Sequence, residues 1–330
     1  MTRKLFSLVL GSFTVLLLMG AGVEDSTETE QLQEQSEQQV QSQVAMVSAV
    51  AGTKAFDLGQ EELTDTEVAE VAVDEAKGAE TKTQAQSVAA TTQVSAAETG
   101  AIQYNETTYV PLVPMAERLV SGSTAVWDAG SQTVTVQGTA LHLTAKVGQQ
   151  YVVANDRYLY VADGVQMRDG RVAVPMGVIA KAFGANVTTD PATGGRILTA
   201  GSGTIQSGSQ YYNSEAMYWL SRVIYSESGN QSLEGQMAVG NVVLNRVASP
   251  IFPNSIEGVL AQKNQFTTYY TGAIQNCNPS TMSIIAAKLV LDGGVVEEVR
   301  NAMYFDSANS SWASRNRTCI ATIGNHRFYL

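Results

Sequence analysis

The spacing of hydrophobic and polar positions changes three times along the chain. An uncharged apolar run covers residues 5–23, and polar low-complexity sequence follows it to about residue 100. Short apolar runs with turn residues between them continue to about residue 200. From residue 213 the apolar positions recur every three or four residues, which is typical of amphipathic helices. The pattern predicts a leader, a tether and two globular domains of different kinds.

The leader has the features of an export signal. Arg3 and Lys4 precede the apolar run, and the small residues 20–22 close it. This arrangement predicts a signal peptide over residues 1–22 and therefore a secreted protein. The alternative is a retained N-terminal membrane anchor, because the run approaches the ~20 apolar residues that span a bilayer.

Charge is concentrated in the segment that follows. Residues 23–100 hold 16 Asp and Glu against 3 Lys, with Phe56 as their one aromatic residue. Such a composition buries too little apolar surface to offset chain entropy, so we expect an acidic disordered tether. Residues 101–330 hold 15 acidic and 15 basic residues, and this balance argues against a nucleic-acid-binding surface.

Residues 101–200 contain an internal repeat. The segment 113–136 is echoed by 174–200, with Val-Pro-Met at 113–115 matching Val-Pro-Met at 174–176. Each copy predicts a strand, a short helix started by proline, a turn near a glycine and a second strand. We therefore expect a small β-rich α+β domain.

This repeat resembles the copper amine oxidase N-terminal-like, or stalk, domain of bacterial wall proteins. The resemblance implies a domain that holds or spaces an enzyme in the wall. His142 is the only histidine of the segment, which has no cysteine, so a copper or zinc cluster cannot be assembled from it. Because His142 alternates with Leu141 and Leu143, it is expected to point outward from a strand.

A Gly/Ser linker is predicted over residues 201–212, followed by a mainly α domain over residues 213–330. One amphipathic helix is expected from the N-cap candidates Asn213 and Ser214 to near Gly229. A second helix should start at Ser232, and its Ala238 and Gly240 should permit close packing. A third should cover residues 281–291, and the tail should add a few strands.

The residue inventory of this domain limits its chemistry. It has no GxSxG motif, one histidine, His326, and no histidine near Cys277, so serine, cysteine and zinc mechanisms lack residues. Glycoside cleavage remains, because its essential group is a carboxylic acid held protonated. Glu227 ends the first helix beside Tyr225, and both the helix dipole and the ring would raise its pKa if it is buried. The alternative is a solvated helix-end residue.

Four segments of this domain resemble, in order and spacing, the SleB/CwlJ-type cell wall hydrolases, which are spore cortex-lytic enzymes. The segments read IYSESGNQSLEGQMAVGNVVLNRV, FPNSIEGVLAQKNQF, AMYFDS and IGNHRFY. The resemblance covers residues 214–330 and implies a lysozyme-like α+β fold. It also implies that one helix-end Glu protonates the β-1,4 bond between N-acetylmuramic acid and N-acetylglucosamine. The family's Arg-Gly-Glu-Pro-like turn is Ser-Gly-Asn-Gln at 228–231.

The resemblance places the catalytic acid at Glu227. Glu234 is a possible second carboxylate, although a Glu in a first helical turn usually interacts favourably with the dipole of its own helix. His326 is expected to be structural. Amide and aromatic side chains could line a sugar groove, with core packing as the alternative for the rings. These candidates are Gln236, Gln265, Phe266, Tyr304 and Phe305.

The resulting hypothesis is an exported, wall-associated peptidoglycan glycosidase that needs no metal or other cofactor. A lytic transglycosylase is favoured, because one Glu suffices when the muramic acid C6 hydroxyl attacks. The alternatives are an amidase acting on the peptide stems and an inactive wall-binding module. The expected partner is a glycan strand, without nucleic acid or further membrane contact, and the protein is expected to be a monomer. Cys277 and Cys319 are predicted to form a disulfide outside the cell, with two free thiols as the alternative.

Overall fold

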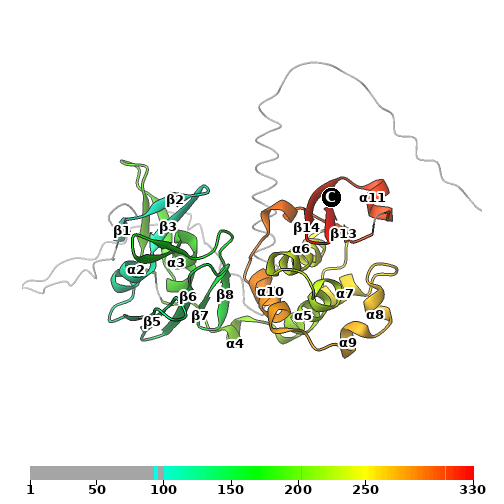
Figure 1. Cartoon of the computed structure of the whole chain (residues 1–330), viewed down its shortest axis with the longest axis horizontal. Coiled ribbons are helices and arrows are strands. Elements are labelled where there is room, and N and C mark those ends of the chain that lie inside the picture. Colours follow the sequence, from blue (N-terminus) through cyan, green and yellow to red (C-terminus); the bar gives the residue numbers. More distant parts are fainter. Residues whose placement is uncertain (1–92, 96–99, 202, 309) are drawn as a thin grey trace, which may run out of the picture. The chain divides into compact units, whose positions relative to one another are not determined.

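The computed structural model describes residues 93–95, 100–201, 203–308 and 310–330, all within one compact unit (Figure 1). The predicted leader and the tether up to residue 92 lie outside the described residues. Within the described part, no helix is both long enough and apolar enough to cross a bilayer.

The first domain contains three antiparallel sheets. One sheet has the order β1, β12, β11, formed by Gln93–Ser95, Arg196–Thr199 and Asn186–Thr189. A second has the order β2, β3, β10, β9, formed by Ile102–Tyr104, Thr107–Pro111, Arg171–Pro175 and Gln166–Arg168. The third runs from β4 to β8 in sequence order, formed by Thr124–Asp128, Thr133–Gly138, Leu141–Lys146, Tyr151–Ala154 and Arg157–Tyr160. Strand β1 precedes residue 101, so the domain begins earlier than predicted.

The two repeats meet in the second sheet, and their alignment with each other is shifted from the predicted one. Val110 of β3 lies opposite Val174 of β10. Helices α2 (Leu112–Leu119) and α3 (Met176–Phe183) follow, with Pro111 and Pro175 as their N-caps. The equivalent Val-Pro step is therefore 110–111 and not 113–114. The sequence VPLVPM offers two such steps, and Pro114 is tolerated in the first helical turn because backbone N–H groups there have no intrahelical acceptor.

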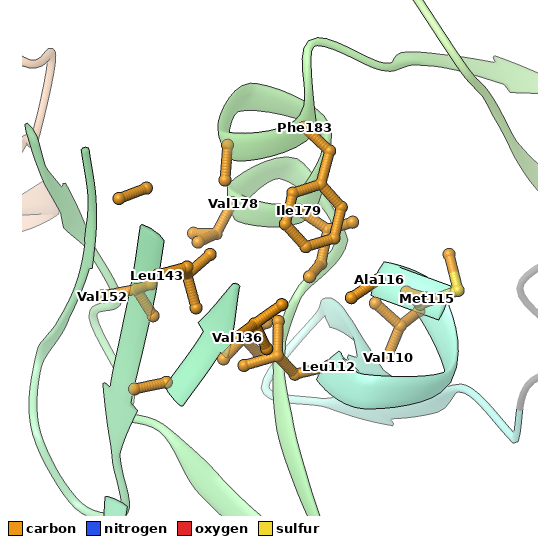
Figure 2. Packing of buried hydrophobic residues seen from close by; sticks show 14 of the residues in the cluster. Val110, Leu112, Met115, Ala116, Val136, Leu143, Val152, Val178, Ile179 and Phe183 are labelled. Atoms are coloured by element: carbon orange, nitrogen blue, oxygen red, sulfur yellow. The ribbon is translucent and has the colours of Figure 1, made fainter. Parts of the chain in front are cut away.

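The core of this domain lies between the two short helices and the five-stranded sheet (Figure 2). Leu112 and Met115 of α2 and Ile179 and Phe183 of α3 are buried against it. Strand β6 contributes Leu143, while His142 beside it is exposed. The outward orientation predicted for His142 is thus confirmed.

The segment predicted as a Gly/Ser linker packs against the first domain. Asn155 Nδ2 donates to the carbonyl of Ile205 at 2.9 Å, and the Gly208 N–H donates to the carbonyl of Asn155 at 2.7 Å. A short helix, α4, covers Gly208–Tyr211. A Cβ at Gly208 would lie 2.5 Å from the Asp156 carbonyl oxygen. Glycine is therefore needed there for close backbone approach, which composition alone cannot distinguish from flexibility.

A buried carboxylate joins β8 to the C-terminal domain within the compact unit. The side chain of Asp292, after α10, has no exposed surface. Arg157 Nε donates to it at 3.0 Å, Lys181 Nζ lies 3.2 Å away, and the Tyr212 hydroxyl also donates to it. The cations and the hydroxyl compensate a charge that would otherwise be strongly unfavourable in the interior.

Three helices form the core of the C-terminal domain, as predicted (Figure 1). They are α5 (Ser214–Ser228), α6 (Leu233–Ala248) and α10 (Thr281–Leu291). The predicted cap Asn213 is confirmed, because its side chain accepts from the Ala216 N–H at 2.9 Å. Ser232, predicted as the start of the second helix, is its N-cap and accepts from the Gly235 N–H at 3.2 Å. A Cβ at Gly240 would lie 3.0 Å from Ile224 and 3.2 Å from Val290, so glycine lets the three helices meet closely.

Shorter elements complete this domain. The helices are α7 (Ile256–Leu260), α8 (Thr267–Tyr270), α9 (Ala273–Asn276) and α11 (Trp312–Asn316), with a 3-10 turn at Glu297–Val299. A sheet in the order β13, β15, β14 consists of Tyr304–Asp306, His326–Tyr329 and Cys319–Ile323.

The predicted disulfide is not formed, because Cys277 and Cys319 are both free. The Cys277 thiol donates to the carbonyl of Ile274 at 3.2 Å, directly after α9. The Cys319 thiol donates to the carbonyl of Ala321 at 3.5 Å within β14. Each thiol has a local partner, and the export argument behind the disulfide contained no information on their proximity.

Candidate active site

Helix α6 fixes the chain that builds one wall of the site. Asn241 donates to the carbonyl of Gly294 at 2.9 Å and accepts from the Val296 N–H at 3.0 Å. One turn later, Asn245 donates to the carbonyl of Ala302 at 2.9 Å. Arg246 Nε donates to the carbonyl of Met303 at 2.7 Å. These contacts hold residues 294–303 along the helix and so determine where β13 begins.

A pocket of 790 Å³ opens beside β13. It brings together the end of α5, the last turn of α6, the loop before α8, β13, the start of α11 and the start of β15. Its lining residues are Glu227, Arg246, Phe252, Lys263, Asn264, Gln265, Phe266, Tyr304, Phe305, Asp306, Ser307, Ala308, Ser311, Trp312, Ala313 and His326.

Glu227 lies in the last turn of α5 and reaches this pocket half-buried. Burial raises the pKa of its carboxyl group, and a hydrogen bond from Thr268 opposes that rise in part. Thr268 Oγ1 donates to Glu227 Oε1 at 2.6 Å. No cation forms an ion pair with Glu227 in the described part of the chain. The arrangement favours a protonated acid over a permanently ionised one.

Helix α5 ends at its C-cap residue Gly229, where close packing against the preceding helical turn requires a glycine. A Cβ at Gly229 would lie 2.6 Å from the carbonyl oxygen of Tyr225 and 2.9 Å from its ring. The predicted helix end near Gly229 is therefore confirmed, and it leaves Glu227 on the last helical turn with its side chain in the pocket.

Four of the five predicted sugar-binding residues line the pocket with Glu227. Gln265 and Phe266 come from the loop before α8, and Tyr304 and Phe305 come from β13. The rings of Phe266 and Phe305 have centroids 6.2 Å apart. The sequence thus identified two segments, about 40 residues apart, that the fold brings together.

The structure does not place Gln236 or Glu234 in the pocket. Gln236 is fully buried, accepts from the Ser283 hydroxyl at 2.7 Å and donates to the carbonyl of Gln231 at 3.0 Å. Its amide therefore links α10 to the start of α6 and is not available to a sugar. Glu234 lies in the first turn of α6 and is not among the lining residues, so it does not supply a second carboxylate here.

Asp306 and His326 line the pocket as well. The Ser311 hydroxyl donates to Asp306 Oδ2, while Asp306 Oδ1 is buried; burial and the nearby Asp306 carboxylate raise the pKa of Tyr329. His326 is 7% exposed, and burial lowers the pKa of its imidazole, so the ring is neutral at pH 7.

Arg246, Thr268 and Trp312 were also missed. Arg246 alone had a recognisable signal, because a charged residue in the apolar stretch VVLNRV of a predicted helix is unusual. Metal binding is a separate question. The described residues contain no group of three or more His, Cys, Asp or Glu side chains placed to hold a metal ion.

Comparison with protein families matches two separate segments. Residues 230–329 match the family model described as Cell Wall Hydrolase. Residues 88–198 match the model described as Copper amine oxidase N-terminal domain. The chain therefore carries a cell wall hydrolase domain after a copper amine oxidase N-terminal domain, and both resemblances seen in the sequence are confirmed. Glu227 lies three residues before the start of the match to the cell wall hydrolase model.

Among curated proteins, a spore cortex-lytic enzyme of Bacillus cereus is 35% identical over 121 residues, which are 36% of this chain and 45% of that protein. The spore cortex-lytic enzyme of Bacillus subtilis is 35% identical over 112 residues, which are 33% of this chain and 35% of that protein. The chain thus spans less than half the length of these relatives.

Two solved structures are also similar. One is the catalytic domain of the germination-specific lytic transglycosylase SleB from Bacillus anthracis, at 30% identity, with 38% of this chain and 100% of that chain covered and a TM-score of 0.33. The other is the catalytic domain of the Bacillus cereus SleB protein, at 30% identity, with 36% and 92% covered and a TM-score of 0.32.

Proposed function

We propose that the C-terminal domain cleaves the glycan strands of peptidoglycan, with Glu227 as the general acid. The observation that carries this proposal is the environment of Glu227. Its carboxyl group is half-buried in a pocket, its pKa is raised by burial, and its hydrogen-bond partner is a neutral hydroxyl. Glycoside cleavage needs a carboxylic acid that is still protonated near neutral pH, and burial is the physical means of keeping one.

The pocket also offers surfaces suited to sugars. Trp312 is 54% exposed at its edge, with its ring centroid 5.5 Å from that of Tyr304. Aromatic faces pack against the apolar faces of pyranose rings, and amides such as Gln265 can pair with acetamido groups. These features support a polysaccharide substrate rather than a peptide stem.

We favour a lytic transglycosylase over a water-using muramidase. Asp306 is the second carboxylate of the pocket, but one of its oxygens is engaged by Ser311 and the other is buried. It is therefore poorly placed to activate a water molecule. Glu227 alone can protonate the leaving oxygen and then, as a carboxylate, accept the proton of the muramic acid C6 hydroxyl as that oxygen closes on C1. The nucleophile belongs to the substrate, so the attack is intramolecular.

Export and wall association complete the proposal. The apolar run at residues 5–23 would direct the chain out of the cell, and the first domain would hold or space the enzyme in the wall. Similarity to spore cortex-lytic enzymes supports peptidoglycan as the substrate. An amidase would need a metal or cysteine centre, and the described residues of the pocket include no cysteine.

The test is digestion of purified peptidoglycan with the wild-type protein and two matched variants. Wild type should release muropeptides with 1,6-anhydromuramic acid ends, identified by mass spectrometry. Glu227→Gln should lower the rate by about two to four orders of magnitude, the usual contribution of a positioned acid, while circular dichroism shows an unchanged fold. Glu234→Gln, outside the pocket, should retain nearly full activity.

Each result has a counterpart that would contradict the proposal. Muropeptides with reducible muramic acid ends would show that water attacks, and would return Asp306 to consideration as a base. Wild-type turnover by folded Glu227→Gln would remove Glu227 as the acid. Release of free peptide stems would indicate the amidase.

A further inference from the structure

Arg246 is a buried cation without a carboxylate partner in the described part of the chain. The residue is 4% exposed, and its Nε–H donates to the carbonyl of Met303. Its guanidinium carbon lies 5.2 Å from the ring centroid of Phe252, 5.4 Å from that of Phe266 and 5.2 Å from that of Tyr304. No other hydrogen bond from the guanidinium to a described residue is seen, and its two terminal nitrogens are not among the fully enclosed unpartnered atoms, so they face the pocket.

Arg246 remains charged at neutral pH despite its burial. Burial lowers the pKa of its guanidinium only to about 10. The surrounding ring faces attract a cation, but they offer no hydrogen-bond acceptor to its N–H groups. A buried charge normally has both an opposite charge and hydrogen-bond partners. The guanidinium therefore lacks an anionic partner that a ligand could supply.

The missing partner would enter from the pocket that holds Glu227. Arg246 and the three rings around it all line this pocket. The other charged side chains of the lining are Glu227, Lys263 and Asp306, and none of them forms an ion pair with Arg246. Lys263 adds a second, exposed cation on the same pocket. An anionic group of the substrate would thus find one buried and one exposed positive charge.

Building on the proposed function, we infer that Arg246 binds a carboxylate of the glycan substrate and so determines which sugar occupies this part of the pocket. A guanidinium presents parallel N–H groups that match the two oxygens of a carboxylate. Of the two sugars of the glycan strand, only muramic acid has a carboxyl substituent, the lactyl group on O3, whereas N-acetylglucosamine has none. Arg246 would therefore place a muramic acid beside it and fix the register of the strand relative to Glu227.

This carboxylate has two chemical sources. In a muramic acid without a peptide, it is the lactyl carboxylate itself. In a muramic acid with a single alanine, the lactyl group is an amide and the carboxylate is the alanine's. Both present the same planar anion, and they differ in its distance from the pyranose ring.

The test measures binding in the full chain carrying Glu227→Gln, so that no ligand is cleaved. Four N-acetylglucosaminyl-N-acetylmuramic acid ligands are titrated by NMR or calorimetry: the free lactyl acid, its methylamide, the alanine-terminated form and its alaninamide. At least one acid should bind about tenfold more tightly than its own amide, which corresponds to ~1.4 kcal/mol. That preference should decrease as salt is raised. The acid that shows it identifies the source.

Variants then assign the preference to Arg246. Arg246→Gln in the same background should abolish the difference in affinity between acid and amide. Arg246→Lys should retain part of this difference, because the positive charge remains but the parallel N–H groups of the guanidinium are lost. Lys263→Gln should have the smaller effect, because its charge is exposed. If Arg246→Gln fails to fold, the comparison of acid with amide on the unchanged arginine still decides.

Equal binding of both acids and their amides would overturn the inference, as would an acid preference that persists in folded Arg246→Gln. Failure of the proposed function is a separate result. It would appear as absence of glycan cleavage by wild type, whatever the outcome of these titrations.

Discussion

Replacing Thr268 with valine should make Glu227 a weaker acid and extend activity to higher pH. Thr268 Oγ1 donates to Glu227 Oε1 at 2.6 Å and thereby stabilises the ionised carboxylate. Burial raises the pKa of Glu227, and this hydrogen bond is the opposing influence. Without the hydroxyl, the pKa should rise further. Because cleavage needs the protonated acid, activity is lost as pH rises through this pKa, and the alkaline limb should move upward.

The size of the effect follows from the hydrogen bond. A hydrogen bond to a charged group contributes ~1.5–3 kcal/mol. Thr268 is only half-buried, so water replaces part of the lost interaction and the lower end applies. An energy of ~1.4 kcal/mol is a factor of ten. On the alkaline limb, the Thr268→Val variant should therefore retain about tenfold more of its own plateau activity than wild type does.

The assay is the initial rate of muropeptide release between pH 4 and pH 10, each profile normalised to its plateau. Thr268→Ser keeps the hydroxyl and should follow wild type.

The pH dependence of the free energy of unfolding is an independent measurement of the same pKa. The folded pKa of Glu227 lies above its ordinary value of 4.5, so its contribution to stability is complete below that value and is lost as pH rises through the folded pKa. Thr268→Val should deepen this alkaline loss. An alkaline limb that stays in place, or moves to lower pH, would refute the reasoning.

Three further outcomes are expected. Trp312→Ala should raise KM for long glycans about two- to tenfold, for a stacking contribution of ~0.5–1.5 kcal/mol, whereas Tyr270→Ala, equally exposed but outside the pocket, should leave KM unchanged. Gln236→Leu should lower the free energy of unfolding by about 1–3 kcal/mol, since it removes the hydrogen bond from Ser283 and leaves the Gln231 carbonyl without its side-chain donor. A raised KM with unchanged stability in urea titration would argue that its amide meets substrate. Thiol titration of the denatured, unreduced protein should find two reactive thiols, and none would reinstate the disulfide.

The parts of the fold that local chemistry determines were predictable. The caps Asn213 and Ser232 and the turn at Gly229 define α5 and α6, because each acts within a few residues of itself. Glu227 was placed correctly at the end of α5 for the same reason. The convergence of Gln265 and Phe266 with Tyr304 and Phe305 followed only from the family resemblance.

Longer-range features were not predictable in this way. The choice between the two Val-Pro steps at 110–111 and 113–114 depends on the pairing of β3 with β10. Gln236 reads as a polar residue suited to a sugar, and only its contact with Ser283, 47 residues away, shows that it is internal. The same applies to Arg246, whose three rings come from separate segments.

The position of β15 has a consequence for the order in which the domain can assemble. His326–Tyr329 is the middle strand of its sheet, with β13 on one side and β14 on the other. A growing chain that has reached residue 320 contains Glu227 and all of α6, but β13 has no neighbour to pair with. Contacts between Glu227 and the sheet that faces it join distant parts of the sequence. Such contacts form late, because loop closure must come first. The carboxylic acid would therefore exist during synthesis without the wall that faces it, and competence to bind a glycan would arise only after the chain has passed residue 329.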